Sequence, residues 1–144
     1  MSSLIRYPKN LSADLKRQIR ASFQNALNSF DDDDIAYVQK KCRRVIARLA
    51  NTDDWHSDVA IVADALFGEF HSLIESDAEE PITFVVGASL FYLGSPFDII
   101  PDHHPGRGYL DDAYVLDLCL RQLERDAPII FTRIENALLQ QRTA

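Results

Sequence analysis

The chain has 144 residues, of which 47% are apolar and 26% are charged, so it has the size and composition of one domain able to bury a hydrophobic core. Its formal net charge of −7 argues against a protein that wraps nucleic acid, because neutralising phosphates requires a net positive surface. The charge is unevenly divided. Residues 1–50 carry a net +5 and residues 51–144 a net −12, so we expect the two halves to face each other in part.

The first two predicted helices lie in the basic half. Residues 11–30 carry apolar side chains three and four apart with basic ones between them, which indicates an amphipathic helix. We expect the acidic run from Asp31 to Asp34 to cap a second helix over 35–50, whose apolar stripe includes Cys42. Capping is favoured over calcium binding, because the run lacks the spaced ligands and the turn glycine of an EF-hand loop.

Two more helices are predicted in the middle of the chain. The segment "NTDDW" at 51–55 offers caps for a third helix over 55–75. A fourth helix over 81–93 begins at a proline and is apolar nearly all round, so we expect it at the centre of the fold. It belongs to an uncharged run of 17 residues between Glu80 and Asp98, whose prolines and glycines favour a core helix and a turn over a membrane span.

The last two helices are predicted over 111–125 and 127–141. No segment shows the alternation or the regularly spaced β-branched runs of strands. We therefore predict an all-α fold, in which residues 1–144 form a single compact bundle of five or six helices around the apolar helix 81–93.

The two cysteines indicate a reducing compartment. Cys42 and Cys119 occupy apolar helical positions outside any zinc-binding spacing, and we predict reduced core thiols. The first residues, "MSSLIRYPKN", lack the apolar region of a secretory signal. Together these features predict a cytoplasmic protein.

A turn-rich segment, "SPFDIIPDHHPGRGYLDD" at 95–112, separates the fourth and fifth helices. Ser95 and Asp98 have the spacing of a capping box, with Pro96 at the first helical position. Pro101 ends this short turn, and a loop rich in proline and glycine follows.

The end of the same segment is predicted to start the fifth helix. Leu110 and Val115 flank Asp111 like the two halves of a hydrophobic staple, so Asp111 is predicted to be the N-cap and Asp112 a first-turn carboxylate. We interpret the segment as a fixed structural corner built by Ser95, Pro96, Asp98, Pro101, Asp102, Gly108, Asp111 and Asp112.

A divalent-metal site is the second interpretation of the corner, since carboxylates and imidazoles bind Mn²⁺, Fe²⁺ and Zn²⁺. The adjacent His103 and His104 weaken it, because neighbours in an extended loop point apart. His56 and His71 are isolated, and we expect them at the surface or at a helix end. The candidate metal ligands are Asp98, Asp102, His103, Asp111 and Asp112. No other cofactor is predicted.

The stretch "FYLGSPFDIIPDHHPGRGYLDDAYVL", Phe91 to Leu116, resembles the YkvA-like family, a bacterial domain of unknown function (number 1232). The family pattern runs approximately Y-L-x-S-P-x-D-x-I-P-D, a short turn, then G-[YF]-x-D-D, and this chain departs from it at "HHPGRG". The resemblance implies a helical hairpin over 81–125 joined by a fixed polar corner, and it implies no catalytic chemistry. Residues 1–80 have no recognised family.

The absence of known catalytic motifs favours a non-enzymatic protein-interaction module. One version is an acidic neutraliser of a basic partner, of the immunity-protein or antitoxin type, because acidic complementarity would speed such an encounter. Its candidate contacts are Asp31, Asp32, Asp33, Asp34, Asp53 and Asp54, with Asp58 and Asp64 in the same acidic set.

A third interpretation is peripheral binding to an anionic membrane or to nucleic acid through a basic stripe of helix 35–50. The resemblance adds to it, since relatives often appear with membrane-associating segments. The candidate anion-binding residues are Lys40, Lys41, Arg44 and Arg48, with Arg43 beside them. Pairing of this stripe with the acidic half of the same chain is favoured over it, because sparse basic stripes are usually solvated or salt-bridged.

Overall fold

The computed structural model describes residues 4–50, 52, 54–76, 80–94 and 108–143. These described ranges contain six helices and no strand, which confirms the predicted all-α bundle. They are α1 (Ala13–Ser29), α2 (Asp32–Ala50), α3 (Trp55–Glu75), α4 (Glu80–Gly94), α5 (Leu110–Asp126) and α6 (Pro128–Thr143).

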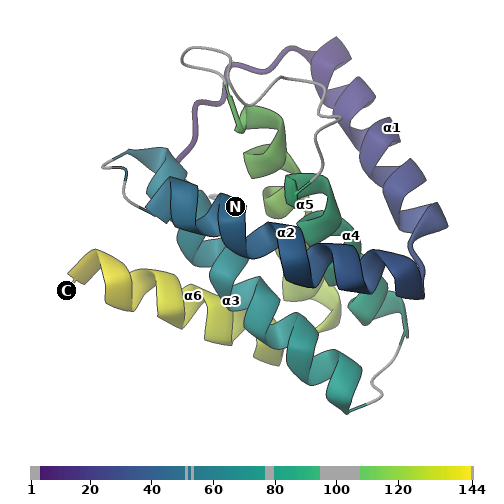
Figure 1. Ribbon diagram of the computed structural model, residues 1–144. Coiled ribbons are helices and arrows are strands. Elements are labelled where there is room, and N and C mark those ends of the chain that lie inside the picture. Colours follow the sequence, from purple (N-terminus) through teal and green to yellow (C-terminus); the bar gives the residue numbers. More distant parts are fainter. Residues whose placement is uncertain (1–3, 51, 53, 77–79, 95–107, 144) are drawn as a thin grey trace.

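The core is built around α4, as its all-round apolar sequence predicted. This helix packs against α1, α2, α3 and α5, and Figure 1 shows it enclosed by them. Gly87 allows α4 to pack closely against the rings of Phe30 and Phe70. A Cβ at this position would lie 2.5 Å from the Phe30 ring and 2.8 Å from the Phe70 ring.

A second helix, α5, is as central as α4, which the sequence did not reveal. It packs against α1, α3, α4 and α6, and its residues from Leu110 to Asp117 are all buried. Asp111, Asp112 and Asp117 interrupt its apolar pattern, and all three are buried.

The segment before α1 also contributes to the core. Ile5, Tyr7 and Leu11 are buried, and the Tyr7 hydroxyl donates a hydrogen bond of 2.9 Å to Asp117 Oδ2. Ser12 then caps α1 by accepting a hydrogen bond from the Leu15 amide. The described segment before α1 therefore contacts the last third of the chain.

An ion-pair cluster fixes both ends of the described chain to the first turn of α3. The buried Asp58 carboxylate accepts from the Arg6 side chain at 2.9 and 3.0 Å and from the Arg142 side chain at 2.8 Å. The Arg6–Asp58 pair joins the basic and acidic halves of the sequence. Those halves were expected to face each other in part.

None of the helices in the described ranges is both long enough and apolar enough to cross a membrane. The described part of the uncharged run lies in α4, whose packing against four other helices agrees with the prediction of a core helix.

Candidate functional site

Most of the predicted corner lies outside the described residues, namely Ser95, Pro96, Asp98, Pro101, Asp102 and His103. Gly108, Asp111 and Asp112 are described, and they meet other elements. His56 Nε2 lies 3.1 Å from the Gly108 carbonyl oxygen, and its Nδ1 lies 2.7 Å from Asp54 Oδ1. His56 therefore links the start of α3 to the end of the corner, a role more specific than the helix-end position that the sequence predicted.

The predicted N-cap role of Asp111 is wrong. The helix α5 begins at Leu110, and its N-cap position is Tyr109, whose left-handed φ of 68° costs about 1–2 kcal/mol and whose side chain caps nothing. The predicted hydrophobic staple between Leu110 and Val115 is wrong as well, because it assumed that Asp111 is the N-cap. Asp111 lies inside the first turn and points into the protein, because the helix starts before it.

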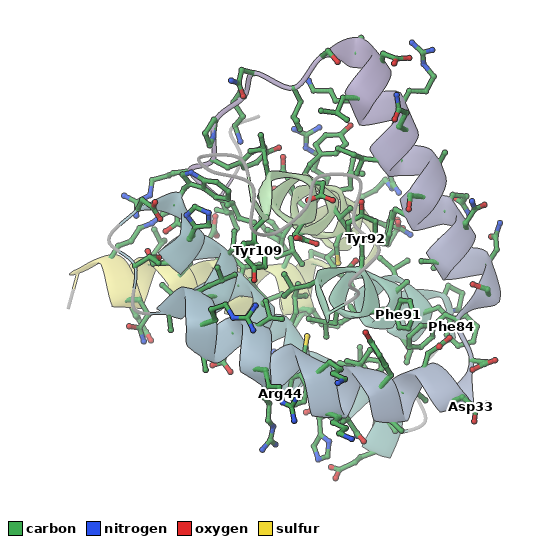
Figure 2. All side chains as sticks on the ribbon, turned by 45° about the horizontal axis from the view of Figure 1, so that its top comes forward. Asp33, Arg44, Phe84, Phe91, Tyr92 and Tyr109 are labelled. Carbon is green, nitrogen blue, oxygen red and sulfur yellow. The ribbon has the colours of Figure 1, made fainter. Side chains whose placement is uncertain are left out.

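Asp111 and Asp112 belong to the buried junction between α4 and α5. The Tyr92 hydroxyl donates a hydrogen bond of 3.1 Å to Asp111 Oδ2. Tyr92 and Tyr109, both labelled in Figure 2, point into the bundle. Asp112 is in the first turn, as predicted, but it is buried. The Asp111 carboxylate therefore holds α5 against α4.

The metal interpretation stays a prediction. Among the residues that the structure describes, no group of three or more His, Cys, Asp or Glu side chains is arranged to hold a metal ion. Three of the proposed ligands, Asp98, Asp102 and His103, lie outside the described ranges.

Several residues of the candidate acidic surface have structural roles as helix caps. Asp31 Oδ1 accepts from the amides of Asp33 and Asp34, and Asp34 Oδ2 accepts from the Asp31 amide, so the run forms the predicted cap of α2. Asp54 is the N-cap of α3 and accepts from the His56 amide. The side chain of Asp32 and all of Asp53 lie outside the described part.

Asp58 and Asp64 differ sharply in their surroundings. Asp58 is fully buried between Arg6 and Arg142, so the interpretation of this residue as a surface contact is wrong. A pattern of acidic residues along one stretch could not reveal this, because one of its two cationic partners is 84 residues away. Asp64 is exposed on α3.

The basic stripe lies on the outer face of α2. Lys40, Arg43, Arg44 and Arg48 are exposed and Lys41 is half-buried, while Val38, Cys42, Val45 and Leu49 face the core. Figure 2 shows Arg44 pointing away from the bundle.

The favoured pairing of this stripe with the acidic half is not seen among the described residues. No described carboxylate lies within ion-pair distance of Lys40, Lys41, Arg43 or Arg44. Arg48 is used internally in another way, since it donates a hydrogen bond of 3.0 Å to the Tyr109 hydroxyl. The face is therefore basic and directed outward.

A groove, which the sequence did not predict, runs beside this face along the boundary of α2 and α3. It consists of a hollow of about 340 Å³ and a neighbouring hollow of about 280 Å³, which share Ile46 and Asp64 in their linings. At one end the Arg43 guanidinium carbon lies 5.5 Å from the centre of the Phe67 ring. The remaining lining residues are Ala47, Ala50, Ser57, Ala60, Ile61 and Gln141.

Both thiols are buried and free, which confirms them as unpaired core cysteines. Burial raises the pKa of Cys42 to about 12, with a smaller contribution from the charge of Asp112, and burial raises the pKa of Cys119 to about 12 as well. Neither is therefore suited to nucleophilic chemistry.

The fold and these contacts define an all-helical domain organised around the α4–α5 pair. The model of a family described as "Protein of unknown function (DUF1232)" matches residues 83–118, which confirms the resemblance inferred from Phe91 to Leu116. The matched segment runs from α4 through the corner to the first half of α5. No curated protein and no solved structure matches the chain.

Proposed function

We propose that this protein is a non-enzymatic interaction module that binds an acidic surface of another protein through the outer face of α2. The proposal rests on the exposure of the cations on this face and on their lack of described ion-pair partners. Lys40, Arg43 and Arg44 are exposed and have no described carboxylate within ion-pair distance, in a chain whose net charge is −7. Such cations are available to carboxylates of a partner, and charge complementarity speeds encounter and fixes orientation.

The basic face is better supported than the acidic one as the contact surface. Asp31 and Asp34 exchange hydrogen bonds with backbone amides of the cap, Asp54 binds His56, and Asp58 is buried between arginines. These carboxylates already have partners within the chain. Among the described residues of the candidate acidic set, Asp33 and Asp64 remain as exposed carboxylates without such contacts, and they lie far apart on α2 and α3.

The groove and the location of the exposed apolar residues favour a protein partner over a membrane or nucleic acid. Insertion into a bilayer requires protruding apolar side chains on the binding face, whereas the exposed large ones in the described ranges, Ile129 and Leu139, are both on α6. Phosphate recognition requires cations but no apolar hollow, and the net charge disfavours it. A hollow beside cations suits a protein that offers both acidic and apolar side chains.

The absence of enzymatic activity and a cytoplasmic location are parts of the same proposal. The two thiols are buried with raised pKa values, which supports a structural role for them. Free cysteines persist in a reducing compartment, which supports the cytoplasm.

A site-specific cross-link in the organism of origin tests this proposal. A photoreactive amino acid with a short alkyl-diazirine side chain, much smaller than tryptophan, replaces the exposed Ala47 on α2, and in a second strain it replaces the exposed Asn136 on α6 as a control. We expect position 47, and not position 136, to give an adduct with one protein, linked through a segment rich in Asp and Glu. The adduct should be lost when Lys40, Arg43 and Arg44 are all changed to Gln.

Equal adducts at the two positions, or an adduct at 47 that persists in the triple variant, would overturn the proposed surface. Adducts of position 47 with lipid or nucleic acid would overturn the proposed class of partner and favour the anionic-surface alternative. No adduct at 47 would count against the module itself.

A further inference from the structure

The groove between α2 and α3 has the shape of a binding site for a helix. We infer that it receives an amphipathic α-helix of the partner, acidic along the side that faces α2 and carrying one hydrogen-bond donor opposite Asp64. The inference rests on the proposed function, and it adds where the partner lies and what its contact segment looks like.

Small side chains create the space. Ala47 and Ala50 on α2 and Ala60 on α3 line the hollows where larger residues would fill them. The floor between them is apolar, with Ile46 and Ile61 on the two helices. Hollows of about 340 and 280 Å³ each correspond to roughly ten water molecules. Apolar side chains that displace the water over Ile46 and Ile61 bury apolar area, whereas Ser57, Asp64 and Gln141 in the same lining require polar partners.

The two adjoining hollows together extend along about two turns of α2. Ala50 lines one hollow and Arg43 the other, seven residues apart on α2, which corresponds to about 10 Å along the helix axis. Two apolar residues separated by two helical turns on the occupant would stand at the same distance. Anchors repeated in this way are the common signature of a helix bound in a groove.

The charges along the groove are segregated. Arg43 lies at the Phe67 end, and Lys40 and Arg44 are its neighbours within one turn of α2. An acidic side of the occupant would face them. This complementarity selects an acidic helix over a basic or a wholly apolar one.

Asp64 determines the register. It lines both hollows, and no described cation lies within ion-pair distance of it. A uniformly acidic helix would be repelled at this point, whereas a helix with a lysine, arginine or amide between its two anchors would be held there. A repulsive element of this kind adds specificity to the attraction of the basic rim.

A selection of helical peptides on the full-length purified protein tests the inference. The probe is a displayed library of helix-forming peptides with all side chain types at the exposed positions. We expect the enriched sequences to carry two apolar residues seven apart, Asp or Glu along one side, and a donor between the anchors. Enrichment of a different pattern, or of no pattern, would overturn the inference.

Variants with matched controls locate the binding. Ala47→Trp fills a hollow and leaves every charge in place, whereas Ala36→Trp puts the same side chain at an exposed position of α2 that lines neither hollow. We expect Ala47→Trp to weaken binding of an enriched peptide about tenfold or more, and Ala36→Trp to change it less than about twofold. Ala50→Trp, in the other hollow, repeats the test if the first variant is misfolded.

The outcomes separate the groove from the basic face. The triple variant with Lys40, Arg43 and Arg44 changed to Gln could lose binding while both tryptophan variants of the groove bind normally. This result would contradict binding in the groove and would leave the proposed basic surface supported. Normal binding in all of them would contradict both. Asp64→Asn should reduce the preference for peptides with a donor between the anchors, and an unchanged preference would contradict the role of Asp64.

Discussion

Two glycines in core helices have opposite reasons to be present. Nothing lies within 4 Å of a Cβ built on Gly68 in the exposed face of α3, whereas a Cβ on Gly87 of α4 would collide with the rings of Phe30 and Phe70. We expect Gly68→Ala to stabilise the protein by about 0.5–1 kcal/mol, since it removes backbone freedom from the unfolded chain. Gly87→Ala should destabilise it by roughly 1–3 kcal/mol through overpacking. Urea unfolding of the two variants measures both, and equal effects would contradict this packing.

Asp58 is predicted to make the protein acid-sensitive. Burial raises the pKa of its carboxyl, but hydrogen bonds from Arg6 and Arg142 outweigh burial and hold that pKa below the ordinary value of 3.8. The stability from this ion-pair cluster is therefore complete above the ordinary value and is lost as the pH falls through the lower folded value.

The variant Asp58→Asn gives the measurement. At neutral pH it should lower the free energy of unfolding by about 1–3 kcal/mol, because the hydrogen bonds of two partly exposed arginines to a charged partner are lost. Between neutral pH and about pH 3, the variant should lose less stability than the wild type. Parallel pH dependences of the two proteins in urea unfolding would show that Asp58 is not the titrating group.

Neither cysteine should react in the folded protein. Burial raises the pKa of both thiols to about 12, so almost no thiolate is present at mildly alkaline pH. Intact-mass measurement after iodoacetamide treatment should show no label without denaturant and two labels in urea. Rapid labelling of the native protein would contradict the burial of Cys42 and Cys119.

At the scale of helices, the sequence was informative where the apolar repeat was regular. The bounds of α3 agree with the prediction of 55–75, and the central position of α4 followed from its composition. The burial of α5 could not be read in the same way, because its three buried aspartates resemble a solvent-facing side until their partners are known. Those partners, such as Tyr7 and Tyr92, come from other elements.

The contact between α4 and α5 can be tested through Tyr92. Its hydroxyl donates to the buried Asp111 carboxylate, so Tyr92→Phe should lower the free energy of unfolding by roughly 1–3 kcal/mol. Tyr37→Phe is the control, because its hydroxyl donates to the neutral Gly94 carbonyl at a half-buried position, and its effect should be smaller. A larger loss in Tyr37→Phe than in Tyr92→Phe, by thermal or urea unfolding, would contradict the importance assigned to the junction.

For the molecule as a whole, the charge asymmetry of the sequence was a partial guide to the candidate site. Helical spacing placed Lys40 and Arg44 on one face, and both are exposed. The groove could not be predicted, because it depends on how α2 and α3 meet and because the alanines that line it carry no chemical signal. The prediction of internal pairing for the stripe failed among the described residues. Asp54 caps a helix, Asp58 is buried between two arginines, and Asp64 lies beyond ion-pair distance of the cations of the stripe.

The central claim is that the cations on α2 bind an acidic partner. The most direct measurement uses the partner that the cross-link at position 47 identifies. The affinity of this partner is measured for the wild-type protein and for the variant with Lys40, Arg43 and Arg44 changed to Gln, each at low and at moderate salt. The variant Asp33→Asn, at the exposed start of the same helix, is the control for the acidic alternative. We predict that the triple variant binds roughly tenfold to a hundredfold more weakly, with less salt dependence, and that Asp33→Asn binds at least as well as the wild type. Unchanged affinity in the triple variant, or a large loss in Asp33→Asn, would contradict the account.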